Sequence, residues 1–442
     1  MTTLQRSTFV TSRQGDFFNE KELTIQFGCP KALWAATTIK ELVDNALDAT
    51  ESANVAPEIA ITLESDSVTV KDNGPGLPAS TIKSALDYQV RVSDKSAYIS
   101  PTRGQLGNAL KTVFPAAYVA TGQKRAVEVT ACGTHHVIEV SVDRFTKKPQ
   151  IRHDKTPLIQ NGTTVTVHWP GLARWTSHHY DSELYQGTVE QILPNLVQDF
   201  ACLNPHASFT VAAGGKNRIF SARDTAWRKW RTDDPTSAHW YRLEDFRELI
   251  AAEIDKERKA RQKNPDAPRK TLRDFVGEFD GLARPQYRQR VLEEAGLSGK
   301  YLCDLEADVD GEMTLVARLL AAMRSVAKPV KPIRLGVLGR ENMQAALVSY
   351  GAREGSIEYG RDPQIGDDGL PYVVEVAFGI TKEGRPRKLV CGINSSVVFR
   401  VPSPNLHTIL SDCYMDVDEP VAFIVHQSCP RFKFIGHGKG AM

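Results

Sequence analysis

The stretch TTIKELVDNALDATE, residues 37–51, combines a helical apolar pattern with one narrow polar stripe. At about 100° per residue, a helix places Glu41, Asn45 and Asp48 close together on one side. Apolar residues cover the rest of its surface: Ile39, Leu42, Val43, Ala46, Leu47 and Ala49. Such a stripe is either the solvent-facing side of a helix or a functional site, and other parts of the sequence have to decide between the two.

The length of 442 residues is too great for one compact core, and at about 150 residues per domain it indicates three domains. The 55 basic and 53 acidic residues leave a net charge of +2, so any nucleic-acid-binding surface has to be local. Seven widely spaced cysteines form no zinc pattern, which indicates reduced thiols in a cytoplasmic protein, nucleoid-associated if it binds DNA. Without a signal peptide or a run of about 18 apolar residues, no membrane association is expected.

Secondary-structure patterns divide the chain into three parts. Residues 1–222 alternate amphipathic helices with period-two strands such as EIAITLES (58–65) and SVTVKD (67–72), which predicts an α/β layer. Residues 223–310 show almost no strand pattern and predict short helices. Residues 311–442 begin as a helix and change to strands such as YVVEVAFGI after the Pro-rich AKPVKPIRLG. The predicted fold class is therefore α+β, with three unequal domains.

Three short glycine-containing segments follow the opening helix. DNGPG (72–76) ends a strand, RGQLGN (103–108) leads into a helix, and Gly162-Thr163-Thr164 opens another strand. Each of them alone is typical of a common turn or cap. Together they supply the parts of a nucleotide pocket, and the sequence contains no G-x-x-x-x-G-K-[ST] that would indicate the P-loop alternative.

The segments suit different parts of a nucleotide. Asp72 offers an acceptor for the exocyclic amine of adenine, and Gly74 and Gly76 allow the backbone to approach the base closely. Backbone N–H groups at the start of the helix after RGQLGN suit a triphosphate, with Lys95 or Lys111 as an added charge. The remaining residues expected to contact the nucleotide are Arg103, Gly104, Gln105, Leu106, Gly107, Asn108 and Thr164.

The opening stripe then acquires chemical roles. Mg²⁺ prefers hard oxygen ligands and keeps several waters, so the Asn45 side-chain oxygen together with phosphate oxygens is a sufficient anchor. Glu41, one turn earlier, is placed to orient and deprotonate an attacking water. Asp48, farther along the stripe, is expected to support the pocket. The predicted cofactors are therefore ATP and Mg²⁺.

The segments ELVDNALDA, DNGPGLP, RGQLG and GTTVTV resemble the four signature boxes of the GHKL ATPases. The resemblance implies the Bergerat α/β sandwich of that group for residues 1–222. Within the group the chain is similar to the B subunits of topoisomerase VI, a type IIB DNA topoisomerase. TLRDFVGEFDGLARPQYRQRVLEEAGL (271–297) resembles their helix-two-turns-helix insert. PYVVEVAFGI (371–380) and VAFIVHQSCPRFKFIGHGKGAM (421–442) resemble strands of their α/β transducer domain.

The resemblance implies an ATP-hydrolysing clamp. Two copies form a homodimer when ATP binds, and each transducer passes the closure to a Toprim-containing A subunit that cleaves double-stranded DNA. It also implies a transducer lysine at the γ-phosphate, which in the relatives lies in a Trp-Lys-x-Tyr segment. That segment is not visible here. Lys439, assigned a catalytic role, and Lys433 are the candidates, and each is equally compatible with a solvated surface lysine.

Two features keep a second function open. The Trp-Lys segment is missing, and the long helix that follows the family's transducer is not found before the sequence ends. The alternative is a GHKL ATP-dependent switch subunit of a regulatory or defence complex that does not itself support DNA strand passage. One local feature bears on DNA: the Lys/Arg-rich stretch 256–273 is either a solvated surface or a contact for DNA phosphates.

Overall fold

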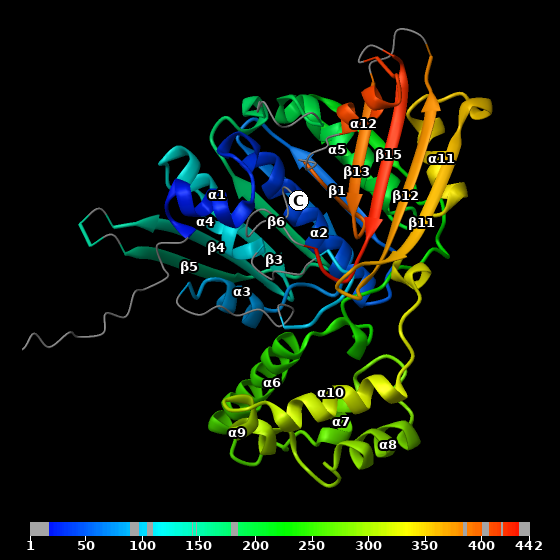
Figure 1. Ribbon diagram of the computed structural model, residues 1–442. Helices are drawn as coiled ribbons and strands as arrows, with labels where there is room; N and C mark the ends of the chain where they lie inside the picture. Colours follow the sequence, from blue (N-terminus) through cyan, green and yellow to red (C-terminus); the bar gives the residue numbers. More distant parts are fainter. Residues whose placement is uncertain are drawn as a thin grey trace, which may run out of the picture.

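The computed structural model describes residues 17–88, 97–103, 109–143, 145–146, 148–177, 184–382, 387–399, 406–416 and 419–432. In this part of the chain three units are visible: a large sheet covered by helices, a second sheet beside it, and a separate helical lobe (Figure 1). None of the helices described is long and apolar enough to cross a lipid bilayer.

The large sheet has the strand order β10-β9-β1-β2-β6-β3-β4-β5. Strand β2 lies between β1 and β6, and both pairs are antiparallel. Lys71 lies opposite Thr164, so the carboxyl end of β2 meets the start of β6. The strands are β1 (Glu58–Leu63), β2 (Ser67–Asp72), β3 (Ala126–Ala131), β4 (Thr134–Val142), β5 (Pro149–Pro157), β6 (Thr163–His168), β9 (Ser208–Ala213) and β10 (Lys216–Phe220).

Helix α2 (Trp34–Ser52) lies over the large sheet, in contact with β2 (Figure 1). Its 19 residues include no glycine or proline, and Trp34, Ile39 and Leu47 are fully buried. No side chain caps its start, so packing of its apolar surface is what stabilises it. The neighbouring helices are α1 (Glu20–Phe27), α3 (Ala79–Ala85), α4 (Ala109–Thr121) and α5 (Val189–Leu203).

The helical lobe has a hydrophobic core of its own, and it extends away from both sheets (Figure 1). Phe246, Phe275 and Phe279 form ring contacts at its centre, with centroids 5.3 to 6.0 Å apart. Helix α10 packs against α6 and α8 in this core, so the predicted domain boundary at residue 310 falls inside the lobe. The helices are α6 (Leu243–Lys263), α7 (Leu272–Gly277), α8 (Pro285–Ala295), α9 (Glu306–Val309) and α10 (Thr314–Val326).

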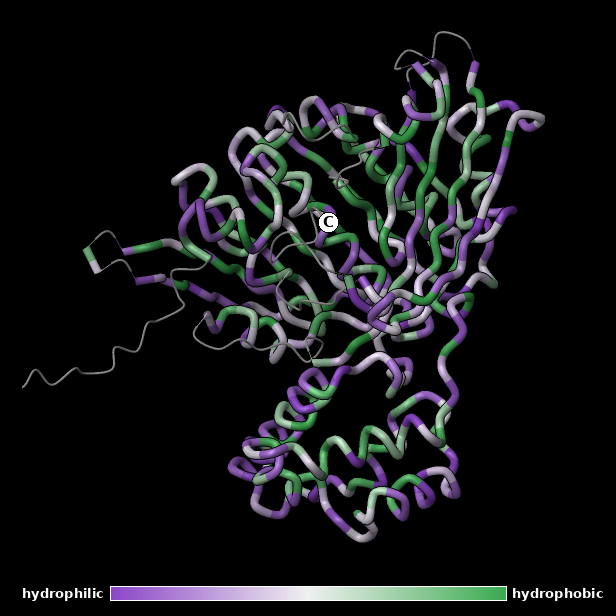
Figure 2. Tube along the Cα trace, in the orientation of Figure 1, coloured by the Kyte–Doolittle hydropathy of each residue, from purple (hydrophilic) through white to green (hydrophobic). Residues whose placement is uncertain are grey.

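The second sheet shares its core with the large one. Its strand order is β11-β12-β15-β13-β14. Helix α5 packs against strands of both sheets, and α11 packs against the second sheet and against α5. Leu347, Val390 and Phe399 belong to the same continuous core as α2. Figure 2 shows hydrophobic residues running along the strands of both sheets. The elements are α11 (Arg340–Ser349), β11 (Glu358–Ile365), β12 (Pro371–Ile380), β13 (Lys388–Ile393), β14 (Ser396–Val397), α12 (Leu406–Asp412) and β15 (Val421–Ser428).

The architecture confirms the predicted α+β fold class with several domains. The assignments of the lobe as a helix-two-turns-helix insert and of the second sheet as a transducer stay predictions. Two of the three units form one packed body, whereas the lobe folds around a separate core.

Candidate nucleotide site

Most residues of helix α2 are buried, and one line along the helix is partly exposed to solvent. Glu41, Asn45 and Ala49, spaced four residues apart, are half-buried, whereas the residues between them are buried. We call this line the open stripe. Asp48, predicted to share the stripe, is only 6% exposed, because Arg103 covers it.

Lys40 joins the open stripe to the buried side of α2. Its ammonium donates to Glu41 Oε1 at 3.2 Å and to Asp44 Oδ2 at 2.9 Å. Burial alone would lower the pKa of Lys40, but the attraction to Asp44 and Glu41 outweighs burial and raises the pKa above its ordinary value. Lys40 is therefore charged at neutral pH, and its charge holds the Glu41 carboxylate in place.

The Asn45 amide has an unused polar atom. Its Nδ2 is buried and makes no hydrogen bond with any described residue. Because the two ends of an amide are interchangeable by rotation, the same position can present the oxygen to a ligand. No three His, Cys, Asp or Glu side chains gather into a metal site in the described part of the chain. An amide oxygen is among the hard ligands that Mg²⁺ accepts, so Asn45 fits a Mg²⁺ whose other ligands are nucleotide and water oxygens.

Asp72 ends β2 in a position that the neighbouring strand fixes. Its Oδ1 accepts hydrogen bonds from the backbone N–H of Gly74 at 2.8 Å and of Thr163 at 3.1 Å. Burial raises the pKa of Asp72, and these bonds, with another from the Thr163 side chain, partly oppose the rise. Thr164, the predicted nucleotide contact, projects from the other face of β6 and accepts a hydrogen bond from Gln160. Thr163, which was not among the predicted contacts, is the threonine beside Asp72.

The backbone around Asp72 is too tightly packed for most side chains. Gly162 has a φ of +75°, and a Cβ at this position would lie 1.9 Å from the Asp72 carbonyl oxygen. Gly76 has a φ of +93°, and a Cβ there would lie 2.9 Å from Cys132 Sγ. Only glycine fits either position. The glycines therefore allow the loop after β2 to pack closely against the start of β6 and against Cys132.

Arg103, the last residue described before segment 104–108, is almost completely buried among acidic side chains of α2. Its guanidinium donates to Asp48 at 3.1 Å and to Glu51 at 2.8 and 2.9 Å, and it also bonds Asn204. Lys229 lies 3.1 Å from Glu51. Burial would raise the pKa of Glu51, but Arg103 and Lys229 hold it well below its ordinary value. The hydrogen bonds of the Arg103 guanidinium are thus made to buried groups, mainly the carboxylates of α2.

Several predicted site residues lie outside the described residues: Lys95, Gly104, Gln105, Leu106, Gly107, Asn108, Lys433 and Lys439. Their assignments to phosphate contacts stay predictions. Lys111, in the first turn of α4, donates to the Asp87 carbonyl oxygen at 2.6 Å, and burial lowers its pKa. The described site therefore consists of the open stripe and the region around Asp72.

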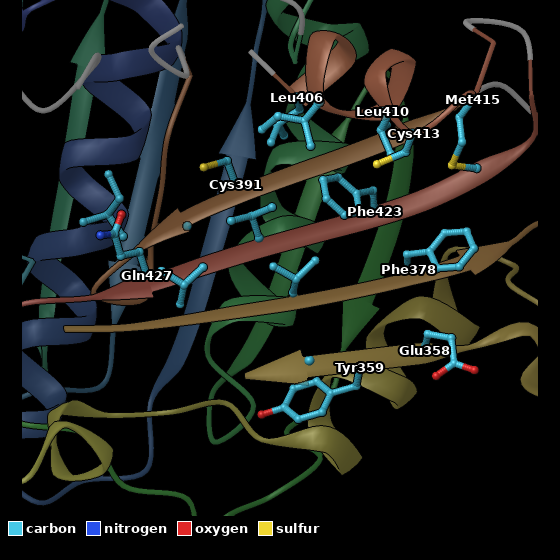
Figure 3. A pocket seen from close by; sticks show the side chains of 17 residues that line it. Glu358, Tyr359, Phe378, Cys391, Leu406, Leu410, Cys413, Met415, Phe423 and Gln427 are labelled. Carbon is cyan, nitrogen blue, oxygen red and sulfur yellow. The ribbon is translucent and has the colours of Figure 1, made fainter. Parts of the chain in front are cut away.

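The second sheet carries a separate cavity of about 830 Å³ on the face next to α12 (Figure 3). Phe378, Phe423, Leu410 and Met415 project toward it from the strands and from the α12 segment (Figure 3). The described lining is mainly apolar and contains no lysine or arginine. Because a triphosphate needs cations or N–H donors, this cavity does not resemble a second nucleotide site.

Comparison with known proteins matches the region of the candidate site to a family. Residues 31–172 match the family described as "Histidine kinase-, DNA gyrase B-, and HSP90-like ATPase". This range includes α2, Asp72 and Thr163. Residues 31–172 thus form a domain that matches the GHKL class of ATPases, and the resemblance drawn from the four sequence boxes is confirmed.

More specifically, the chain is similar to proteins named as the B subunits of type 2 DNA topoisomerase 6. The protein from Sulfurisphaera tokodaii is 26% identical over 408 residues, which cover 86% of this chain and 68% of the relative. The protein from Archaeoglobus fulgidus is 26% identical over 386 residues, covering 85% of this chain and 58% of the relative. The protein from Natronomonas pharaonis is 27% identical over 183 residues, covering 39% and 23%. The chain thus spans between 23% and 68% of the length of these relatives.

Proposed function

We propose that this chain is the ATP-binding and ATP-hydrolysing subunit of a topoisomerase VI-like type II DNA topoisomerase. The observation that carries the proposal is the open stripe, because Glu41 and Asn45 are half-buried polar residues in the middle of a helix that, apart from Ala49 and its last residue, Ser52, is buried. The similarity to the topoisomerase 6 B subunits supports the substrate, DNA, and the partner, a Toprim-containing A-type subunit. ATP-dependent homodimerisation belongs to the same proposal.

In this proposal the residues of α2 have separate tasks. Glu41 orients the attacking water and accepts its proton, since a carboxylate held by Lys40 stays in one place. Asn45 holds Mg²⁺, which supplies charge stabilisation on the phosphates when bound. Asp72 accepts a hydrogen bond from the adenine amine. The lysine at the γ-phosphate is sought in the last residues, with Lys439 and Lys433 as candidates.

The test compares ATP hydrolysis by the wild-type chain and by Glu41→Ala. We expect the variant to bind ATP with unchanged affinity and to hydrolyse it at least about a hundredfold more slowly, since general base catalysis contributes about 10²–10⁴. Glu248→Ala, which removes an exposed glutamate from helix α6, is the control and is expected to retain full turnover. Wild-type turnover in Glu41→Ala would exclude the assignment.

A second measurement separates the two candidate functions. Co-purification with a Toprim-containing subunit, together with ATP-dependent strand passage, supports the topoisomerase. An ATP-hydrolysing chain that captures an unrelated effector and passes no strand supports the switch subunit of a regulatory or defence complex instead. Both outcomes require that Glu41 remains essential for turnover.

Fewer cations of the stretch 256–273 are available for the proposed DNA contact than its composition indicates. Several of its cations lie beside carboxylates of the lobe: Lys256 beside Glu253, Arg258 beside Glu306, Lys259 beside Asp255, and Lys270 beside Glu253 and Glu278. Lys263 and Arg273 are exposed and form no ion pair with any described residue. These two are the strongest candidates for phosphate contacts.

We therefore predict that the double variant Lys263→Glu/Arg273→Glu weakens DNA binding. Loss of two phosphate contacts should reduce the slope of log affinity against log salt by about 1.8. The matched control is Lys216→Glu/Arg218→Glu, two exposed cations on β10 of the large sheet. Binding isotherms at several salt concentrations measure the slope. Equal affinity and slope in both variants would remove the lobe from the DNA interface.

A further inference from the structure

The turn between β13 and β14 adopts a conformation that non-glycine residues rarely accept. Its two residues, Asn394 and Ser395, have φ values of +48° and +63°. Both residues are buried. Such a conformation costs free energy and persists only where the surroundings fix it. It therefore raises the question of what the turn does.

The second sheet fixes the turn from one side. The Asn394 side chain donates to the Cys429 carbonyl oxygen and accepts from the Cys429 N–H, both at 3.0 Å. The Ser395 N–H donates to His426 Nε2 at 3.1 Å. Because Cys429 follows β15 directly and His426 lies within it, the turn moves with the second sheet.

On its other side the turn contacts the ATP-binding domain. Ser396, the first residue of β14, donates its hydroxyl to Asp44 Oδ2 of α2 at 2.6 Å. The Ser395 carbonyl oxygen accepts from Arg103 Nε at 3.3 Å and from the Asn204 amide at 3.0 Å. Residues of the second sheet are thus bonded to the helix that carries the open stripe.

The Ser396 contact leads to Glu41 in two further steps. Asp44 Oδ2, which accepts from Ser396, also accepts from Lys40 at 2.9 Å. Lys40 donates in turn to Glu41 at 3.2 Å and is only 1% exposed. Asp44 and Lys40 are both buried, so solvent does not screen this chain of contacts. Ser396 thus bonds the carboxylate oxygen that also holds the ammonium beside Glu41.

We propose that Ser396 is a positioning residue through which the second sheet controls the general base, by way of Asp44 and Lys40. The inference rests on the proposed ATPase function and deepens it. When the second sheet is docked, as in this structure, the Ser396 hydroxyl fixes Asp44, and Lys40 keeps Glu41 oriented toward water. Separation of the turn from α2 releases Lys40 and slows hydrolysis, while the adenine end around Asp72 stays unchanged.

The experiment measures kcat and KM for ATP in Ser396→Ala, Ser396→Thr and Ser428→Ala of the full chain. Ser396→Ala should lower kcat about tenfold, because small misplacements of a reacting group have effects of this order or larger. Its KM should stay within about twofold of the wild type, since substrate binding is not altered. Ser396→Thr keeps the hydroxyl and should restore most of the lost kcat.

Ser428→Ala is the matched control. Ser428 is a buried serine of the same sheet whose hydroxyl donates to the Gly336 carbonyl oxygen at 2.8 Å, outside the contacts described above. A kcat that falls equally in Ser396→Ala and Ser428→Ala, or that Ser396→Thr does not restore, overturns the positioning role alone. A wild-type chain without ATP hydrolysis, or a fully active Glu41→Ala, overturns the proposed function as well.

Discussion

Two sides of helix α2 differ in how their polar groups are paired. On the open stripe, Glu41 is held by one neighbouring lysine, and Asn45 has a buried amide atom without a described partner. On the buried side, Asp44, Asp48 and Glu51 are all less than 9% exposed and lie beside cations. One helix thus carries a partly exposed side with unused bonding capacity and a buried side whose charges lie beside opposite charges.

The difference shows that the residues that hold α2 in place are not the residues that are available to a ligand. Buried charges contribute little net stability when they are paired, but removing one partner is costly, so they fix a geometry firmly. Arg103 and Lys229 anchor α2 through Glu51, from segments far away in the sequence. The buried side therefore fixes the position of α2, and the open stripe keeps unused bonding capacity for a ligand.

The largest effect is expected from removing the cation of the buried side. Arg103→Met leaves Asp48 and Glu51 without their main partner, which should lower the free energy of unfolding by about 3–5 kcal/mol. Arg218→Met, at an exposed position of β10, should change it by less than about 0.5 kcal/mol. Urea unfolding of the nucleotide-free chain measures both. Equal stability of the two variants would show that the buried acids are not anchored by Arg103.

A smaller effect, with a characteristic pH dependence, is expected from Glu51→Gln. The pKa of Glu51 is held well below its ordinary value, despite burial, by Arg103 and Lys229. Because the unfolded carboxyl has a pKa of about 4.3, its stabilisation is complete above about pH 5 and is lost as the pH falls through the folded value. The variant should be less stable by about 1.5–3 kcal/mol at pH 7.

The same stabilisation disappears in acid, so the difference in unfolding free energy between wild type and Glu51→Gln should narrow below about pH 4. Unfolding curves at pH 7, 4 and 3 follow the difference directly. Glu248→Gln, at an exposed position of α6, is the control and should show no such narrowing. A difference that is constant across this range would contradict the role of the Glu51 charge.

Local patterns were sufficient to predict the main elements of the site. The period of the apolar residues in 37–51 predicted α2, and DNGPG predicted a strand end at Asp72 that the structure shows. The sequence alone does not show which of Thr163 and Thr164 lies beside Asp72. The two are identical neighbours and differ only in the face of β6 that they occupy. That face depends on the pairing of β6 with β2.

Long-range pairings account for most of the remaining differences. The side of α2 that contains Asp48 is covered by Arg103, which lies 55 residues away in the chain. The charge of the stretch 256–273 is reduced by Glu278 and Glu306, which lie beyond it in the sequence. The predicted boundary at residue 310 lies inside the lobe, because the apolar face of α10 alone does not show which core it joins. A helical pattern predicts that a face is buried, but not against what.

The smallest effect on stability is expected on the open stripe. Asn45→Ala removes an amide that lacks a described partner and introduces the best helix former, so the free energy of unfolding should rise or stay within about 0.7 kcal/mol. The functional effect should be large: ATP with Mg²⁺ should raise the melting temperature of the wild-type chain more than ATP with EDTA does. In Asn45→Ala the two shifts should be equal, because the ion has lost its protein ligand. A magnesium-dependent shift that persists in the variant would place the ion elsewhere and leave the unpaired amide of Asn45 without an explanation.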